Sequence, residues 1–311
     1  MPLSEDVLQQ HLRVLGYPEA EKIAVGMQGA VFRLGGGMIG KVWFHAGEEN
    51  LRRLGELFAE LEGRLPYRTP VMLELHRPGR FWVTIEAELP GVPLQDAAPP
   101  FGSPTWDRTC ACVVEVLGEL AQVEATPAMR RLAVMEEPQP FRPHGVSWSD
   151  ALTSLVRRRI ERFGDELSGV IDDFDAKIGK LLELLSAIEE PVARLVHGDV
   201  TAGNILVDED LRPVTLLDFG MLTMEGDPAF DAAAAGSLNE IWSPRVREVE
   251  AAFDAALVSR FGYDAERLLL YRCVHSLLIG NLHDEDPYDR DSALPLAGSL
   301  FSSPAVVAML S

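Results

Sequence analysis

Two short segments near the middle of the chain, separated by a predicted hairpin, constrain its fold more than any other feature. Residues 197–204 read His-Gly-Asp-Val-Thr-Ala-Gly-Asn, and residues 217–220 read Leu-Asp-Phe-Gly. Between them, the apolar stretches 205–207 and 213–217 have strand character and flank an acidic turn. A strand, a turn and a second strand of this length return the chain to the end at which it started. The two motifs are therefore expected to lie side by side.

The polar residues of these motifs have the types and the spacing that phosphoryl-transfer enzymes use. Asp199 is expected to orient an attacking hydroxyl and to accept its proton. Asn204 and Asp218 would supply oxygen ligands for Mg²⁺ on the phosphates of a nucleotide. Each motif alone is a weak signal, since Asp199 could be a turn residue and Asp218 a strand-end cap. The joint pattern, preceded by the apolar strand 194–196, favours a phosphotransferase.

The N-terminal third contains a second set of residues that suits nucleotide phosphates. Residues 26–34 read Gly-Met-Gln-Gly-Ala-Val-Phe-Arg-Leu, a glycine-bearing turn whose small residues let backbone N–H groups approach phosphate oxygens. A hairpin through three glycines then leads into the apolar strand 38–44, in which Lys41 is the lone charge. We interpret Lys41 as the lysine that pairs with the α- and β-phosphates. The alternative is an edge lysine that limits pairing of the sheet.

Composition and charge narrow the classes of partner. The 311 residues, 47% of them hydrophobic, suit one large or two small domains with ample core. No apolar run approaches the ~20 residues of a membrane span, and the first residues lack a signal-peptide core. A formal net charge of −20 argues against nucleic acid and anionic membranes. It suits a cationic small molecule, which a negative cleft attracts, or solubility alone.

Helical periodicity dominates the chain after a β-rich N-terminal part. The expected helices cover Glu5–Leu15, Glu48–Gly63, Thr109–Glu124, Ser149–Phe163, Asp172–Glu189, Pro244–Phe261 and Asp264–Leu282. The proline-bearing stretch Arg130–Ser147 is expected to be irregular, and His275 is interpreted as a core histidine. The three cysteines have no metal-binding spacing, so we expect reduced thiols in a cytoplasmic protein.

With these motifs in this order, the chain resembles the aminoglycoside phosphotransferase family, within the protein-kinase-like fold. The matching pieces, over about two-thirds of the chain, are 26–32, Lys41, 61–66 leading to Pro70, 88–91, 197–204, 217–220 and 226–231. The resemblance implies an α+β, two-lobe fold. A small β-rich nucleotide-binding lobe would span residues 1–89, and a larger, mostly helical catalytic and substrate-binding lobe would span residues 90–311.

The resemblance also implies roles for single residues. Gln28 and Gly29 would contact the phosphates of ATP or GTP. Ala87 and Leu89, at the hinge between the lobes, would offer backbone groups to the base. Asp231 would brace the catalytic loop from its buried position.

Two positions depart from the family pattern. The position that should carry the glutamate partner of Lys41 is occupied by Leu54, while Glu49 and Glu56 lie nearby but off that helix face. Whether either glutamate pairs with Lys41 is left open. In the catalytic loop, Thr201-Ala202 stands where histidine-proline is commoner, which leaves the chemistry intact but alters the substrate side of the loop.

An acidic cluster near residues 284–291 follows the last expected helix. In the resembled family, acidic residues of the C-terminal lobe bind the ammonium groups of the substrate. Asp284 and Asp286 are therefore candidate substrate ligands, with a solvated acidic loop as the alternative.

These patterns together predict a Mg²⁺-dependent kinase that transfers phosphate from ATP or GTP to a hydroxyl of a small cationic molecule. An antibiotic is one candidate substrate, in resistance or self-protection. The alternatives are a metabolite kinase acting on choline, homoserine, a sugar or a nucleoside, and a non-catalytic pseudokinase. A protein kinase is disfavoured, because 226–228 follows the second motif too soon to leave an activation loop. We expect a monomer or homodimer with no nucleic-acid or membrane partner.

Overall fold

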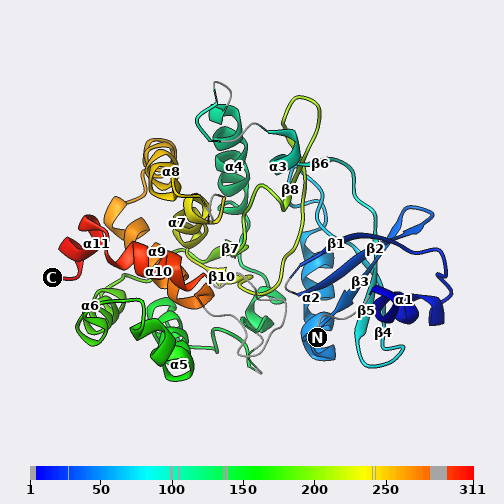
Figure 1. Cartoon of the computed structure of the whole chain (residues 1–311), viewed down its shortest axis with the longest axis horizontal. Helices are drawn as coiled ribbons and strands as arrows, with labels where there is room; N and C mark the ends of the chain where they lie inside the picture. The colour runs from blue at the N-terminus through cyan, green and yellow to red at the C-terminus, as the bar shows by residue number, and fades with distance from the viewer. Residues whose placement is uncertain are drawn as a thin grey trace.

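The computed structural model has the predicted α+β, protein-kinase-like architecture of two lobes. It describes residues 5–26, 28–98, 101–103, 106–135, 137, 139–239, 241, 243–280 and 293–311. Figure 1 shows the N-terminal sheet with helices α1 and α2 at one end of the molecule, and helices α4 to α11 gathered toward the other. The boundary predicted at residues 89 and 90 stays a prediction.

The N-lobe is built on one antiparallel sheet in the order β1-β2-β3-β5-β4. Its strands are β1 (Glu21–Val25), β2 (Gly29–Gly35), β3 (Met38–Trp43), β4 (Met72–His76) and β5 (Trp82–Ala87). Helix α1 (Glu5–Val14) packs Leu8 and Leu12 into a small core with Phe32 and Ile85. Helix α2 (Glu48–Leu61) instead buries its apolar stripe in the main core of the molecule, which includes Trp43. The two faces of the sheet therefore serve two separate cores.

The predicted hairpin between the two motifs is confirmed. It consists of β8 (Ile205–Val207) and β9 (Pro213–Leu216), and the short β6 (Val92–Pro93) adds to its edge. Just before the hairpin, β7 (Arg194–Val196) pairs with β10 (Met224–Gly226). Together, the short strands β7, β8, β9 and β10 bring the catalytic loop and the Asp-Phe-Gly segment close to each other near the centre of Figure 1.

Helices form most of the C-lobe. They are α3 (Leu94–Ala97), α4 (Trp106–Leu120), η1 (Met129–Arg131), α5 (Trp148–Ser168), α6 (Phe174–Ser186), α7 (Pro228–Leu238), α8 (Val246–Phe261), α9 (Ala265–Ile279), α10 (Leu294–Phe301) and α11 (Pro304–Met309). Apart from η1, the described part of Arg130–Ser147 is irregular, as predicted. Helix α5 continues beyond its predicted end at Phe163, where the backbone kinks at φ −126° and ψ 18°.

Helix α7 was not predicted, because its sequence lacks the periodicity that marks a surface helix. Residues from Ala229 to Ser237 are all buried, so no polar face interrupts the run of small side chains. The three cysteines are buried free thiols, as expected. Within the described ranges, no helix is long and apolar enough to cross a membrane.

Candidate functional site

The catalytic loop begins at a glycine that no other residue can replace without strain. Gly198 follows β7 with φ +84°, a left-handed conformation. A Cβ atom at this position would lie 2.3 Å from the Cβ of Leu222 and 2.6 Å from its carbonyl oxygen. The segment after Asp-Phe-Gly therefore packs directly on the backbone of the catalytic loop, and this contact requires glycine.

Asp231 braces the start of the catalytic loop. Its carboxylate accepts hydrogen bonds from the backbone N–H groups of His197, at 2.7 Å, and Gly198, at 2.6 Å. Burial raises the pKa of Asp231 to about 6, although both hydrogen bonds act to lower it. Asp231 thus contacts the two residues that directly precede Asp199.

Asn239, at the other end of α7, holds the next part of the loop and was missed by sequence reasoning. Its side-chain oxygen accepts from the N–H of Ala202 at 2.7 Å, and its amide nitrogen donates to the carbonyl of Val200 at 3.2 Å. Proline, the commoner residue at position 202 in the resembled family, has no N–H to donate. The departure at Ala202 thus provides a hydrogen bond to helix α7.

Asp199 and Asn204 form one hydrogen-bonded pair. The side-chain nitrogen of Asn204 donates to Oδ2 of Asp199 at 2.8 Å and to its backbone carbonyl at 3.0 Å. The amide oxygen of Asn204 thereby faces away from Asp199. Burial, followed by the charge of Asp218, raises the pKa of Asp199 to about 7, which is near the working range of a general base.

His197 is a structural part of the loop. Its Nδ1 accepts from the N–H of Asp199 at 3.1 Å, and its Nε2 lies 2.9 Å from the carbonyl of Leu217. Burial lowers the pKa of His197 to about 4, so the ring is neutral and donates through Nε2. The ring of Phe219 lies 4.4 Å from that of His197, and Phe58 of α2 packs on Phe219 at 6.1 Å between centroids. An aromatic column thus connects α2 with the catalytic loop.

Asp218, two residues after β9, pairs with Lys41 on β3. Nζ of Lys41 lies 2.6 Å from Oδ1 of Asp218, and the two side chains are 13% and 36% exposed. Burial acts to raise the pKa of Asp218, but the charge and hydrogen bond of Lys41 outweigh it and the pKa lies below its usual value. Asp218 adopts φ +61°, a left-handed conformation that aspartate tolerates better than most non-glycine residues.

Neither glutamate considered as a partner of Lys41 contacts it. Glu49 pairs with Arg53 on the same helix. Glu56 pairs with Arg131, at 2.5 Å. The predicted position, Leu54, is 4% exposed in the main core. The question left open by the sequence is therefore answered against both glutamates.

The turn before β2 lies over the Asp-Phe-Gly segment. The side chain of Gln28 lies close to Gly220, where an added Cβ would be 3.1 Å from its oxygen. Position 29 leaves no room for a side chain, because a Cβ atom there would lie 2.3 Å from the carbonyl oxygen of Val42 on β3. Contact of Gln28 and Gly29 with phosphates stays a prediction.

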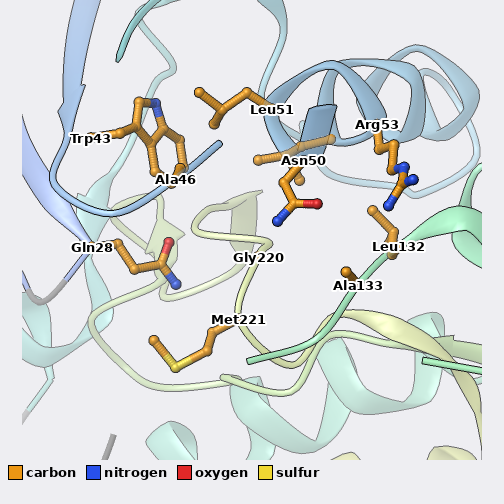
Figure 2. Close-up of a pocket in the computed structure, with 11 residues that line it drawn as sticks. Gln28, Trp43, Ala46, Asn50, Leu51, Arg53, Leu132, Ala133, Gly220 and Met221 are labelled. Atoms are coloured by element: carbon orange, nitrogen blue, oxygen red, sulfur yellow. The ribbon is translucent and has the colours of Figure 1, made fainter. Parts of the chain in front are cut away.

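A pocket opens between this turn, helix α2 and the residues after Asp-Phe-Gly. Figure 2 shows the amides of Gln28 and Asn50 pointing into it from opposite sides, with Trp43 and Met221 among its other walls. Leu54 also lines the pocket. No described residue of its lining is a carboxylate, and the lining includes the cationic side chain of Arg53.

The hinge residues lie at the end of β5. Ala87 is the last residue of that strand, and its N–H donates to the carbonyl of Val71 at 3.1 Å. Any contact of Ala87 with a base would therefore use its carbonyl. Leu89 follows Glu88, whose N–H donates to the carbonyl of Gly37 at 2.8 Å. Their contact with a nucleotide base stays a prediction.

The acidic cluster lies outside the described residues, and with it Asp284 and Asp286. The described residues contain no group of three or more His, Cys, Asp or Glu side chains that could hold a metal by themselves. Asn204 and Asp218 are nevertheless oxygen donors of the kind that Mg²⁺ accepts when substrate phosphates and water complete its coordination. The site thus suits a metal that arrives with a nucleotide.

Comparison with solved structures supports this fold. An aminoglycoside phosphotransferase, APH(3'')-Id from Streptomyces rimosus, matches with a TM-score of 0.59 at 16% identity, over 88% of this chain and 97% of that one. A putative fructosamine-3-kinase from Haemophilus somnus matches with a TM-score of 0.62 at 13% identity, over 98% and 97%. At such identities the likeness shows the fold alone.

A type VIII aminoglycoside-3'-phosphotransferase matches with a TM-score of 0.56 at 19% identity, over 87% of this chain and 98% of that one. Among curated proteins, none matches the chain by sequence. The profile of the phosphotransferase enzyme family, abbreviated APH, matches residues 19–269, which contain the catalytic loop, the Asp-Phe-Gly segment and Lys41. The chain therefore belongs to the phosphotransferase enzyme family.

Proposed function

We propose that this protein is a Mg²⁺-dependent kinase that transfers the γ-phosphate of ATP or GTP to a hydroxyl of a small cationic molecule. Asp199 is the general base, and Asn204 and Asp218 are the metal ligands. Lys41 binds the phosphates, together with Gln28 just before β2 and Gly29 at the start of β2. In this proposal the hinge near residue 89 separates the nucleotide-binding lobe from the catalytic and substrate-binding lobe.

One observation carries the proposal, namely the orientation of Asp199 by Asn204. The 2.8 Å hydrogen bond fixes Oδ2 of Asp199 and leaves Oδ1 for a substrate hydroxyl. A carboxylate whose pKa burial has raised to about 7 can accept a proton and release it again near neutral pH. If Asp199 were only a turn residue or a cap, it would need neither the hydrogen bond from Asn204 nor a raised pKa.

The metal would neutralise charge that develops on the transferred phosphoryl group. The residues of this chain supply the positioning. Asn204 presents its amide oxygen because its nitrogen is engaged by Asp199, and Asp218 is held in place by its backbone and by Lys41. With Lys41, Asp199, Asn204 and Asp218 all present and gathered at one cleft, a non-catalytic pseudokinase is the weaker alternative.

The net charge of −20 supports a cationic substrate, because an acidic protein attracts cations to its clefts. Structural neighbours have been captured with ADP and streptomycin, and with GDP and kanamycin, which supports both a purine nucleotide and an antibiotic of that kind. The fructosamine-3-kinase neighbour, aligned over 98% of this chain, keeps a metabolite kinase as the second candidate.

The test is a screen of aminoglycosides and cationic metabolites for release of ADP or GDP, with phosphorylated product identified by mass spectrometry. Asp199→Asn should lower turnover of the verified substrate by ~10²–10⁴-fold while Mg·nucleotide still binds. Turnover near that of the wild type in this variant would refute the assignment of the base. Absence of Mg·ATP and Mg·GTP binding by the wild-type protein would refute the proposed function as a whole.

A further inference from the structure

The side chain of Glu86 is a buried carboxylate that the catalytic machinery described above does not use. Glu86 is 7% exposed and lies on β5, one residue before Ala87. Its neighbours Val83 and Ile85 face the small core beneath α1. Because side chains alternate along a strand, Thr84 and Glu86 face the opposite side of the sheet.

Lys41 faces the same side, as its neighbour on the adjacent strand. In the register of β3 and β5, Lys41 lies directly opposite Thr84. Side chains opposite each other in an antiparallel pair lie on one face, and those at i and j±2 remain within reach of long side chains. Glu86 is such a diagonal neighbour of Lys41.

A chain of hydrogen bonds fixes the Glu86 carboxylate at this place. The indole N–H of Trp43 donates to Oγ1 of Thr84 at 3.0 Å, and the Thr84 hydroxyl donates to Oε1 of Glu86 at 2.7 Å. The ring of Trp43 also lies 4.0 Å from Nζ of Lys41. Burial raises the pKa of Glu86, while the charge of Lys41 opposes this rise, so the two groups interact electrostatically.

Protein kinases hold the corresponding lysine with a glutamate from the helix that follows it, and both must be in place for phosphate binding. In this chain, Leu54 occupies that position on α2, and the described lining of the adjacent pocket has no carboxylate. Lys41 is paired with Asp218 instead. A metal on Asp218 would compete with Lys41 for this carboxylate, and a second carboxylate near Lys41 would then keep the lysine in place.

We propose that Glu86 is this second carboxylate, a positioning residue that holds Lys41 toward the nucleotide phosphates in place of a glutamate on α2. The inference rests on the proposed function, because it concerns the nucleotide-bound state. In this proposal, a residue on the strand before the hinge holds the lysine, whereas protein kinases use a residue on a helix. Neutralising Glu86 should therefore weaken binding of phosphates but leave binding of the base unchanged.

The experiment compares the wild type with Glu86→Gln by calorimetry, using Mg·ATP, Mg·GTP, adenosine and guanosine as probes. Loss of an outer partner that orients a ligand typically costs 10–100-fold, so we expect the Kd of the preferred Mg·nucleotide to rise roughly 10-fold or more. The Kd of the matching nucleoside should stay within about twofold, because Lys41 contacts only the phosphates. Thr84→Val, which keeps the carboxylate but removes its hydrogen bond, should weaken Mg·nucleotide binding in the same direction and by less.

A matched control is the variant Glu250→Gln. Glu250 is another buried glutamate, on α8, and it forms an ion pair with Arg247 at a distance of 2.5 Å. This variant should leave Mg·nucleotide binding unchanged even if it lowers the unfolding temperature. Leu54→Glu, which returns a carboxylate to α2, should restore part of the binding lost in Glu86→Gln. A general packing role of Glu86 would not be rescued by a charge placed on another element.

The outcomes separate the inference from the function on which it rests. If the wild type binds Mg·nucleotide and Glu86→Gln binds it equally well, Glu86 does not position Lys41. If the variant loses nucleoside and nucleotide binding in equal proportion, Glu86 acts on the base or on the fold, and the inference is overturned. If the wild type binds neither Mg·ATP nor Mg·GTP, the proposed function fails first and the inference falls with it.

Discussion

Replacing Gly198 by alanine is the most direct test of how the catalytic loop is held. The φ of +84° would cost alanine about 1–2 kcal/mol. The added Cβ would also lie 2.3 Å from Leu222 Cβ and 2.7 Å from its carbonyl carbon. Forcing packed atoms apart typically costs another 1–3 kcal/mol. We therefore expect Gly198→Ala to lower the free energy of unfolding by about 2–5 kcal/mol.

Gly262 provides a matched control. It also has a positive φ, +70°, at the end of α8, but a Cβ there would meet nothing within 4 Å. Gly262→Ala should thus cost only the conformational part, about 1–2 kcal/mol. The change in unfolded-state entropy on replacing glycine by alanine is shared by both variants and cancels between them.

The assay is urea unfolding of the two variants and the wild type, followed by circular dichroism. Adding Leu222→Ala should not rescue Gly198→Ala, because the carbonyl atoms of Leu222 remain in the way. With a verified substrate, turnover of Gly198→Ala should fall by ~10²-fold, since an error of about 1 Å in the position of Asp199 is enough. Equal stability losses in the two alanine variants would refute the claim that Leu222 locks the loop.

Three further outcomes are expected. Asp218→Ala should abolish Mg²⁺-dependent nucleotide affinity in calorimetry, and Asn204→Ala should reduce it less, because an amide is a weaker ligand for a hard cation. Burial lowers the pKa of His275 from 6.5 to about 4, so its contribution to stability is complete above pH 6.5 and is lost as the pH falls toward 4. In chemical unfolding at several pH values, the free energy of unfolding of the wild type should fall relative to that of His275→Gln, by up to about 3 kcal/mol between pH 6.5 and 4. A difference between the two proteins that does not change with pH would contradict this role of His275. Asn239→Ala should destabilise the protein by about 1 kcal/mol or more, because the partly buried N–H of Ala202 loses its partner. The loss should be smaller in an Ala202→Pro background, which has no N–H at this position; full additivity in this double-mutant cycle would argue against the contact.

The elements that the sequence predicted well are those whose signal is local. The hairpin between the two motifs consists of two apolar stretches separated by an acidic turn, and the strands β8 and β9 form where these two stretches predict them. The hydrogen bond of 2.8 Å between Asn204 and Asp199 was not predicted, although the two residues lie close together in one motif.

Elsewhere the signal was hidden by burial or by distance along the chain. Helix α7 is enclosed on all sides, so its sequence carries no polar face to reveal a period. The partner of Lys41 in the structure, Asp218, lies 177 residues away in the sequence. Glu49 and Glu56 form ion pairs with Arg53 and Arg131, which sequence reasoning did not identify as their partners. Glu86 could have been noticed as a lone acid in an apolar strand, which is the same signal that marked Lys41.

Helix α7 specifies the path of the catalytic loop from outside the loop. Asp231 binds backbone N–H groups at its start, and Asn239 binds backbone groups at positions 200 and 202. Because both contacts are made to main-chain atoms, the side chains of the partly exposed residues 201–203 contribute little to its shape. These three residues can therefore diverge during evolution, or be exchanged in the laboratory, while Asp199 and Asn204 keep their relative positions. Under the proposed function, a member of the family could in this way acquire a new acceptor molecule without a change in the residues that transfer the phosphate.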